Sequence, residues 1–165
     1  MKRIRVRLTA EAYAHAMELA GEMAKKSRDW QAKRIHIEDG RTLEDSDDIG
    51  ARGQLAVSVY YELPFPKILD GIKDDSLDTA MHDGRTVQVK TVHQHPQGVL
   101  LVKQHELGIA NLYILCMETD TRMEIDILGW LTSEKFLEKA ERQRFHDKPL
   151  GVWEKDLRDP AELHW

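Results

Sequence analysis

The chain is poor in cysteine and has no long apolar run. Its one cysteine, Cys116, excludes an internal disulfide, and its place in the apolar run 112–117 predicts a buried, inert thiol. No apolar run approaches the ~20 residues needed to cross a bilayer, and the basic start at residues 1–3 is not followed by the apolar region of a signal peptide. We therefore expect a cytoplasmic protein that does not interact with membranes.

Excess positive charge is absent as well. The 165 residues include 24 Lys and Arg and 29 Asp and Glu, which gives a net charge of −5. Because phosphate contacts supply most of the nonspecific affinity for nucleic acid, any such binding must come from local patches. A candidate is the start of the chain, where Lys2, Arg3, Arg5 and Arg7 alternate with apolar residues. In a strand this basic row would either grip a phosphate backbone or protect an exposed sheet edge from aggregation.

Length and composition predict one domain. A chain of 165 residues can bury one core, and 41% hydrophobic with 32% charged residues is typical of a globular protein. We therefore treat residues 1–165 as a single domain with its core at about 49–138. The tail at 147–165 contains two prolines, a glycine and two tryptophans. We expect it to be irregular and to wrap the domain or meet a partner.

Hydrophobic periodicity predicts alternating helices and strands. We expect a strand at 3–8, a helix that starts at Thr9 as N-cap and fades at 25–28, and an acidic surface loop at 38–48. Further predictions, in chain order, are a helix at 50–61, a hairpin within 77–91, a strand at 99–102, a turn or short helix at 103–110, strands at 112–117 and 125–130, and a helix at 134–144 capped by Ser133.

The helix at 50–61 has two faces. Its buried stripe consists of Leu55, Val59 and Leu63. A neighbouring polar face consists of Gln54, Ser58 and Tyr61. Gln54 can therefore point toward the hairpin.

Loop length decides which side chains meet in the hairpin. Asp83-Gly84 between two β-prone runs is a strong hairpin signal, because Gly84 can adopt the positive φ that such turns require. A two-residue turn would pair the residues directly beside Asp83 and Gly84. A three-residue loop ending at Gly84 would instead pair Met81 with Arg85. We favour the three-residue loop.

The three-residue loop gives the hairpin a polar face. It places Asp78 directly opposite Gln88, and because side chains alternate along a strand, Lys90 shares that face. Val87 and Val89 then point the other way, toward a core. A two-residue turn would place Asp78 with the valines, and no polar site would form.

These residues resemble the motif of the PD-(D/E)xK phosphodiesterase superfamily, the restriction-endonuclease-like nucleases. In that superfamily an Asp precedes an acidic-x-Lys, sometimes Gln-x-Lys, motif on the next strand. Here Leu77-Asp78 is followed, after nine residues, by Gln88-Val89-Lys90.

Context extends the resemblance to about residues 49–138. The helix at 50–61 is similar to the helix that precedes the hairpin in the superfamily, with Gln54 at a position usually held by Glu. The strands at 112–117 and 125–130, leading into a helix, resemble the small phage and prophage members. The implied fold is α/β, with a restriction-endonuclease-like core of about four to five strands in a central mixed sheet flanked by helices.

The resemblance also implies a metal site. Asp78, the side-chain oxygen of Gln88 and the backbone carbonyl of Val89 would hold Mg²⁺ or Mn²⁺, which would polarise the scissile phosphate and lower the pKa of a bound water. Lys90 would orient or help deprotonate that water, or neutralise charge on the phosphorane. Gln54 would complete the catalytic set from the helix.

The sequence departs from the superfamily at three positions. Leu77 replaces the proline, which does no chemistry. Gln54 and Gln88 replace acidic residues, and an amide oxygen binds a hard cation more weakly than a carboxylate does. Asp78 is then the only matched carboxylate.

The leading hypothesis is a Mg²⁺- or Mn²⁺-dependent DNA endonuclease or exonuclease of phage or prophage type, with a homodimer favoured if both strands are cut. The alternative is a nuclease-fold protein that no longer cleaves and serves as a nucleic-acid-binding or protein-interaction module. A further alternative is a hairpin without function, whose Gln and Lys side chains simply face water. A zinc site is a weaker hypothesis, because one His-x-His pair with one cysteine matches no closed ligand set. Independently of zinc, we expect His93 or His95, in the loop after Lys90, to contact DNA near the scissile phosphate.

Overall fold

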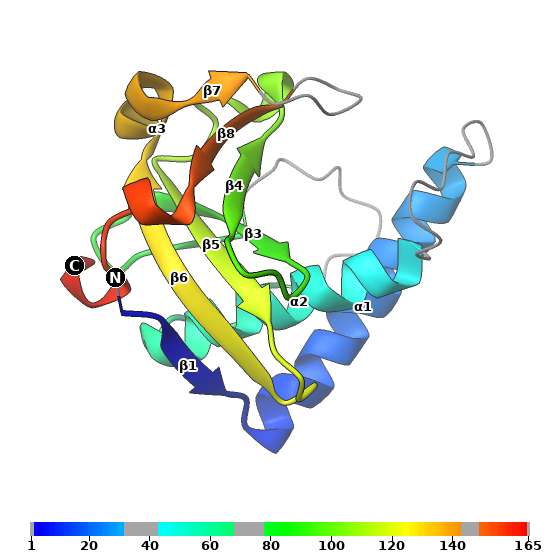
Figure 1. Cartoon of the computed structure of the whole chain (residues 1–165). Helices are drawn as coiled ribbons and strands as arrows, with labels where there is room; N and C mark the ends of the chain where they lie inside the picture. Colours follow the sequence, from blue (N-terminus) through cyan, green and yellow to red (C-terminus); the bar gives the residue numbers. More distant parts are fainter. Residues whose placement is uncertain (1, 32–42, 68–77, 143–148, 165) are drawn as a thin grey trace.

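The computed structural model describes residues 2–31, 43–67, 78–142 and 149–164 (Figure 1). Residue Leu77 of the motif lies outside the described residues, as do 38–42 of the expected acidic loop, 143–144 of the expected last helix, and 147–148 and 165 of the tail. The elements in chain order are β1 (Ile4–Arg7), α1 (Ala10–Gln31), α2 (Leu43–Tyr60), β2 (Thr79–Ala80), β3 (Thr86–Val92), β4 (Val99–Val102), the 3₁₀ helix η1 (Gln104–Glu106), β5 (Leu112–Glu118), β6 (Glu124–Thr132), α3 (Ser133–Lys139), β7 (Glu141–Arg142), β8 (Leu150–Trp153), and the 3₁₀ helices η2 (Glu154–Asp156) and η3 (Pro160–Glu162).

The described strands form two sheets. The larger has five strands in the order β1-β6-β5-β3-β2, and the smaller has three in the order β4-β8-β7. Within the larger sheet β3 and β5 are parallel, and the other pairs are antiparallel. The predicted α/β class with a mixed sheet of about four to five strands is therefore confirmed. The expected strand at 99–102 also forms, but in the second sheet.

Both long helices extend further than the sequence predicts. Thr9 caps α1 as expected, since its Oγ1 accepts a hydrogen bond from the Ala12 N–H at 3.1 Å. The predicted end at 25–28 is wrong because that segment holds no glycine or proline, and the helix continues to Gln31. The predicted loop is also wrong from residue 43 onward. There the chain is already helical, because α2 begins at Leu43.

Helices lie on both faces of the larger sheet, as expected, but the two long helices α1 and α2 both cover the same face (Figure 1). On that face the side chains of β1, β3, β5 and β6 bury against α1 and α2. The opposite face packs against β4, β8 and the short helix α3. The larger sheet is therefore buried on both faces, and β3 contributes to both cores.

The last helix is shorter than predicted. Its N-cap is Thr132 rather than Ser133, because the Thr132 hydroxyl accepts from the Lys135 N–H. The helix ends at Lys139, and the chain then enters β7. In β7 the chain pairs with β8 instead of continuing as a helix.

The C-terminal segment is more ordered than the sequence predicts. It forms β8, η2 and η3 rather than an irregular tail. As expected, it wraps the domain: the Tyr61 hydroxyl donates to the Pro160 carbonyl at 2.9 Å, and the Trp130 indole donates to the Asp159 carbonyl at 3.0 Å. None of the helices in the described part of the chain is long and apolar enough to cross a membrane.

Candidate functional site

The hairpin forms with the three-residue loop. The Met81 N–H donates to the Arg85 carbonyl at 2.9 Å, the Gly84 N–H donates to the Met81 carbonyl at 2.9 Å, and Gly84 has a φ of 87°. In the β2–β3 ladder, Thr79 pairs with Val87. This register confirms the predicted hairpin pairing. Extended by one residue, it places Asp78 opposite Gln88.

Asp78 is held by two short hydrogen bonds. Its Oδ1 accepts from Gln54 Nε2 at 2.6 Å, and its Oδ2 accepts from the Val89 N–H at 2.6 Å. The backbone of Asp78 also bonds β3, because its N–H donates to the Val87 carbonyl at 3.0 Å. The carboxylate is therefore fixed at the outer edge of β3, between the sheet and α2.

Gln54 reaches Asp78 because α2 crosses β3 at very short range. A Cβ on Gly53 would lie 1.9 Å from Thr91 Oγ1, so only glycine allows this approach. Gln54 is 9% exposed, and its amide faces the hairpin as predicted. The predicted polar face of α2 is wrong at Tyr61, which is buried and satisfies its hydroxyl on the C-terminal segment.

Gln88 lies on the other face of β3. Val87 and Val89 are buried in the core under α1 and α2, as predicted, whereas Gln88 stands beside Tyr113 of β5, which belongs to the second core. Gln88 is 4% exposed, and its Oε1 is buried with no hydrogen-bond partner among the described residues. A buried acceptor without a hydrogen bond lowers the stability of the fold, so this amide oxygen needs an explanation.

Lys90 contacts a residue that the sequence did not identify. Its Nζ donates to both carboxylate oxygens of Glu106, at 2.9 and 2.8 Å. Glu106 ends η1, in the turn that connects β4 to β5. Burial alone would raise the pKa of Glu106, but the hydrogen bonds and charge of Lys90 and the Lys103 N–H bring that pKa below its ordinary value. No motif signal marks Glu106, because the contact spans 16 residues and depends on how the crossover folds.

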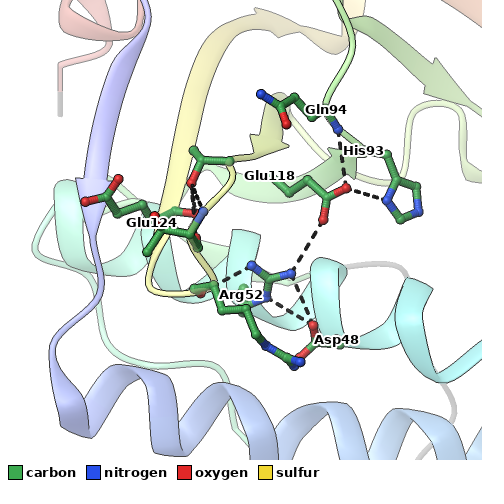
Figure 2. A network of polar contacts seen from close by, with 9 residues as sticks. Asp48, Arg52, His93, Gln94, Glu118 and Glu124 are labelled. Atoms are coloured by element: carbon green, nitrogen blue, oxygen red, sulfur yellow. Dashed lines mark hydrogen bonds and ion pairs between the residues drawn. The ribbon is translucent and has the colours of Figure 1, made fainter.

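A second polar network braces α2 against β3 and β5 (Figure 2). Arg52 is 3% exposed and bonds Asp48 on its own helix and the Arg122 carbonyl, each at 3.2 Å. It also lies 3.7 Å from Glu118, whose other oxygen is 2.5 Å from His93 Nδ1. Through Glu118, the network links Arg52 on α2 to His93, the residue that follows β3. It therefore helps to fix the distance across which Gln54 and Asp78 meet.

The zinc hypothesis gains no support from the geometry. His93 is engaged with Glu118, and His95 Nδ1 lies 2.8 Å from the Gln97 carbonyl oxygen. Within the described ranges, no group of three or more His, Cys, Asp or Glu side chains is placed to hold a metal ion. Cys116 is fully buried as predicted, and burial, with the nearby charges of Asp78 and Asp126, raises the pKa of its thiol.

The basic row at the start of the chain lies on an edge strand. β1 is the outermost strand of the larger sheet. Arg3 forms an ion pair with Glu154 at 2.7 Å, and Arg5 forms one with Asp126 at 2.8 Å. Because carboxylates compensate both charges, the row fits an edge strand better than a phosphate grip.

The donor set fits Mg²⁺ or Mn²⁺ in kind. Asp78 offers a part-exposed carboxylate, and Gln88 offers a buried amide oxygen that lacks a partner among the described residues. Hard cations of this type take oxygen ligands and retain several waters. One carboxylate with neutral oxygens makes a weaker site than two carboxylates.

Comparison with known proteins assigns no family. No protein-family model matches the chain, and no curated protein matches it.

Proposed function

We propose that the chain is a divalent-metal-dependent nuclease that hydrolyses phosphodiester bonds of DNA on a restriction-endonuclease-like core. The supporting observation is the convergence of two motif positions, Gln54 and Val89, on the carboxylate of a third, Asp78. Gln54 from α2 and the Val89 N–H from β3 each donate to Asp78 at 2.6 Å. These two bonds fix both carboxylate oxygens of Asp78 in place, and a carboxylate oxygen is the kind of ligand that a hard cation takes.

The arrangement of elements supports the same core. The hairpin forms one edge of a mixed sheet, and α2 packs across β3 so closely that Gly53 is required. Such a nuclease of phage or prophage type would act in the cytoplasm of a bacterial host. Cleavage of both strands would favour a homodimer, since the chain carries a single copy of the motif.

Each site residue has a defined role in this proposal. Asp78 would provide the anionic ligand, with Gln54 and the Val89 N–H fixing its two oxygens. Gln88 and the Val89 carbonyl would add neutral oxygen ligands, and Lys90 would place positive charge near the phosphate. When bound, Mg²⁺ or Mn²⁺ would polarise the scissile phosphate and increase the acidity of a bound water.

Metal-dependent cleavage of supercoiled plasmid tests the proposal. Wild-type protein with Mg²⁺ or Mn²⁺ should convert the plasmid to nicked or linear forms, and chelation should stop the reaction. Asp78→Asn and Lys90→Met should each reduce the rate by about 10²-fold or more, because each removes a charge aimed at the reacting phosphate. The readout is product appearance on agarose gels over time.

Matched variants control for the loss of charge alone. Asp120→Asn and Lys67→Met remove the same charges at exposed positions and should leave cleavage unchanged. Circular dichroism of every variant verifies folding. Nicking that survives both Asp78→Asn and Lys90→Met would contradict the proposal, because it would arise elsewhere or from a contaminant.

A second function is favoured by one specific observation. The Gln54 amide donates to Asp78, a bond that an ionised glutamate at position 54 would be unable to donate. The pair is thus satisfied without a cation, as expected for a nuclease-fold module that binds nucleic acid or a protein without cleaving. Binding of duplex DNA in a gel-shift assay without cleavage, under all metal conditions, would favour this module. Absence of both binding and cleavage would indicate a protein partner.

A further inference from the structure

The contact between Lys90 and Glu106 brings together residues from separate elements. Lys90 lies on β3, and Glu106 lies on η1, after the chain has passed through β4. The Lys90 side chain is 25% exposed and that of Glu106 is 12% exposed. Both carboxylate oxygens accept from Nζ, so the ammonium is confined to one position at the margin of the second core.

Glu106 is itself fixed independently of Lys90. Its Oε2 also accepts from the Lys103 N–H at 3.1 Å, and its backbone carbonyl accepts from the Tyr113 hydroxyl at 3.1 Å. The Tyr113 hydroxyl in turn accepts from the Gly108 N–H at 3.1 Å, which closes the turn after η1. Tyr113 is fully buried and stands beside Gln88 in the β3–β5 ladder. The turn therefore presents a preset carboxylate to β3.

The charge of Glu106 suits this arrangement. The pKa of its carboxyl lies below the ordinary value, because the bonds and charge of Lys90 and the Lys103 N–H outweigh the effect of burial. The carboxylate thus stays ionised at neutral pH.

We infer that Glu106 is a positioning residue that holds the Lys90 ammonium in place for the reaction at Asp78. This inference rests on the proposed nuclease function. A lysine acts as a compact charge on a flexible stem, so its effect on a reacting phosphate depends on where the stem places it. Two hydrogen bonds from a preset carboxylate restrict that stem before substrate arrives, which is how positioning contributes to rate.

Single-turnover cleavage of a labelled DNA duplex, with protein in excess, separates positioning from binding. Glu106→Gln should lower the cleavage rate constant by about 10- to 100-fold, as expected for a misplaced catalytic group. The dissociation constant for DNA, measured in Ca²⁺ to prevent turnover, should stay within about twofold, because Lys90 keeps its charge. Glu106→Asp, which keeps the carboxylate on a shorter stem, should recover part of the rate.

A matched control and a stability measurement distinguish a structural role. Glu134→Gln removes an exposed carboxylate on α3 and should cleave at the wild-type rate. If Glu106 only stabilises the fold, Glu106→Gln will lower the melting temperature yet cleave at the wild-type rate when folded. Equal rates for wild type and Glu106→Gln at a temperature where both are folded would overturn the inference.

A second measurement does not require activity. Lysine acylation by an N-hydroxysuccinimide ester, followed by mass spectrometry, reports how freely each ammonium reacts, with exposed Lys67 as internal reference. Lys90 should react several-fold faster in Glu106→Gln than in the wild type. If the wild type cleaves no DNA, the proposed nuclease function fails, and the acylation result alone decides whether Glu106 holds Lys90. Equal acylation rates would then overturn the inference.

Discussion

The candidate site depends on a residue that has no side chain. Gly53 lets α2 approach β3 so closely that Thr91 Oγ1 occupies the space of a Cβ, and this approach brings Gln54 onto Asp78. The Thr91 Oγ1 is buried and has no hydrogen-bond partner within the part of the chain that the structure describes. The close packing of α2 on β3 at Gly53 thus coexists with a buried Thr91 hydroxyl that lowers the stability of the fold.

Replacing Gly53 with alanine should disrupt this contact. The added Cβ would lie 1.9 Å from Thr91 Oγ1 and 3.1 Å from Thr91 Cβ, so α2 must shift away from β3. We expect the free energy of unfolding to fall by about 1 to 3 kcal/mol, the usual cost of overpacking. Urea denaturation measures this change. Cleavage should also fall, because Gln54 moves with the helix.

Gly21→Ala is the matched control for this experiment. Gly21 lies within α1, and nothing approaches its Cβ position within 4 Å. This substitution should raise the free energy of unfolding by about 0.5 to 1 kcal/mol through helix propensity alone. A Gly53→Ala variant as stable as Gly21→Ala would show that the helix–strand contact is not tight.

Local residue patterns were sufficient to predict the hairpin part of the candidate site. Asp83-Gly84 fixed the loop, and strand alternation then placed Asp78 opposite Gln88, since both rules act over a few residues. The same rules do not reach Glu106. Its contact with Lys90 depends on the path of a crossover whose direction no local pattern specifies.

At the scale of elements, short strands were the least predictable. The long strands β3, β5 and β6 appear close to their expected positions, whereas the long helices α1 and α2 extend beyond theirs. By contrast, β7 has two residues and β8 has four, and they form by pairing with each other and with β4. A two-residue strand such as β7 has no detectable period, and β8 lies in a segment whose prolines and glycine predict irregular structure.

Two glutamates, Glu106 in η1 and Glu154 in η2, make the stability of the fold depend on pH. Burial would raise the pKa values of Glu106 and Glu154, but hydrogen bonds from Lys90 and Arg3, respectively, bring both below the ordinary value. A group with a lowered pKa in the folded state stabilises the protein above its unfolded pKa. That stability is lost as the pH falls through the folded pKa.

We therefore expect the free energy of unfolding to decrease between about pH 5 and pH 3. In a Glu106→Gln/Glu154→Gln variant the slope against pH should be smaller, by at most the equivalent of about two protons. Urea titrations at several pH values measure both slopes. Parallel curves for the two proteins would contradict this assignment of acid sensitivity.

At the scale of the whole molecule, the C-terminal segment connects the two cores. Leu157 packs in the core under β4 and β8, whereas Leu163 packs in the core under α1 and α2. Between them Arg158 pairs with the Trp130 backbone, and its guanidinium lies 4.5 Å from the centre of the Trp130 ring. The segment thus spans the end of the larger sheet.

Removing residues 157–165 should destabilise both cores together. Loss of two buried leucines corresponds to about 3 to 6 kcal/mol of apolar burial, a large share of the stability of one domain. Urea denaturation followed by tryptophan fluorescence should show a much lower midpoint. The single change Arg158→Ala, which keeps both leucines, should cost about 1 kcal/mol or less. Two separate transitions in the wild type would show that the segment does not couple the cores.

The pairing of β1 with β6 has a consequence for biosynthesis. Arg5 lies opposite Asp126, so β1 can pair with β6 only after about 120 further residues have been translated. Until then β1 lacks the strand that pairs with it in the completed sheet. Completion of the larger sheet is therefore a late event in synthesis, and the nascent chain depends on its other contacts during the interval.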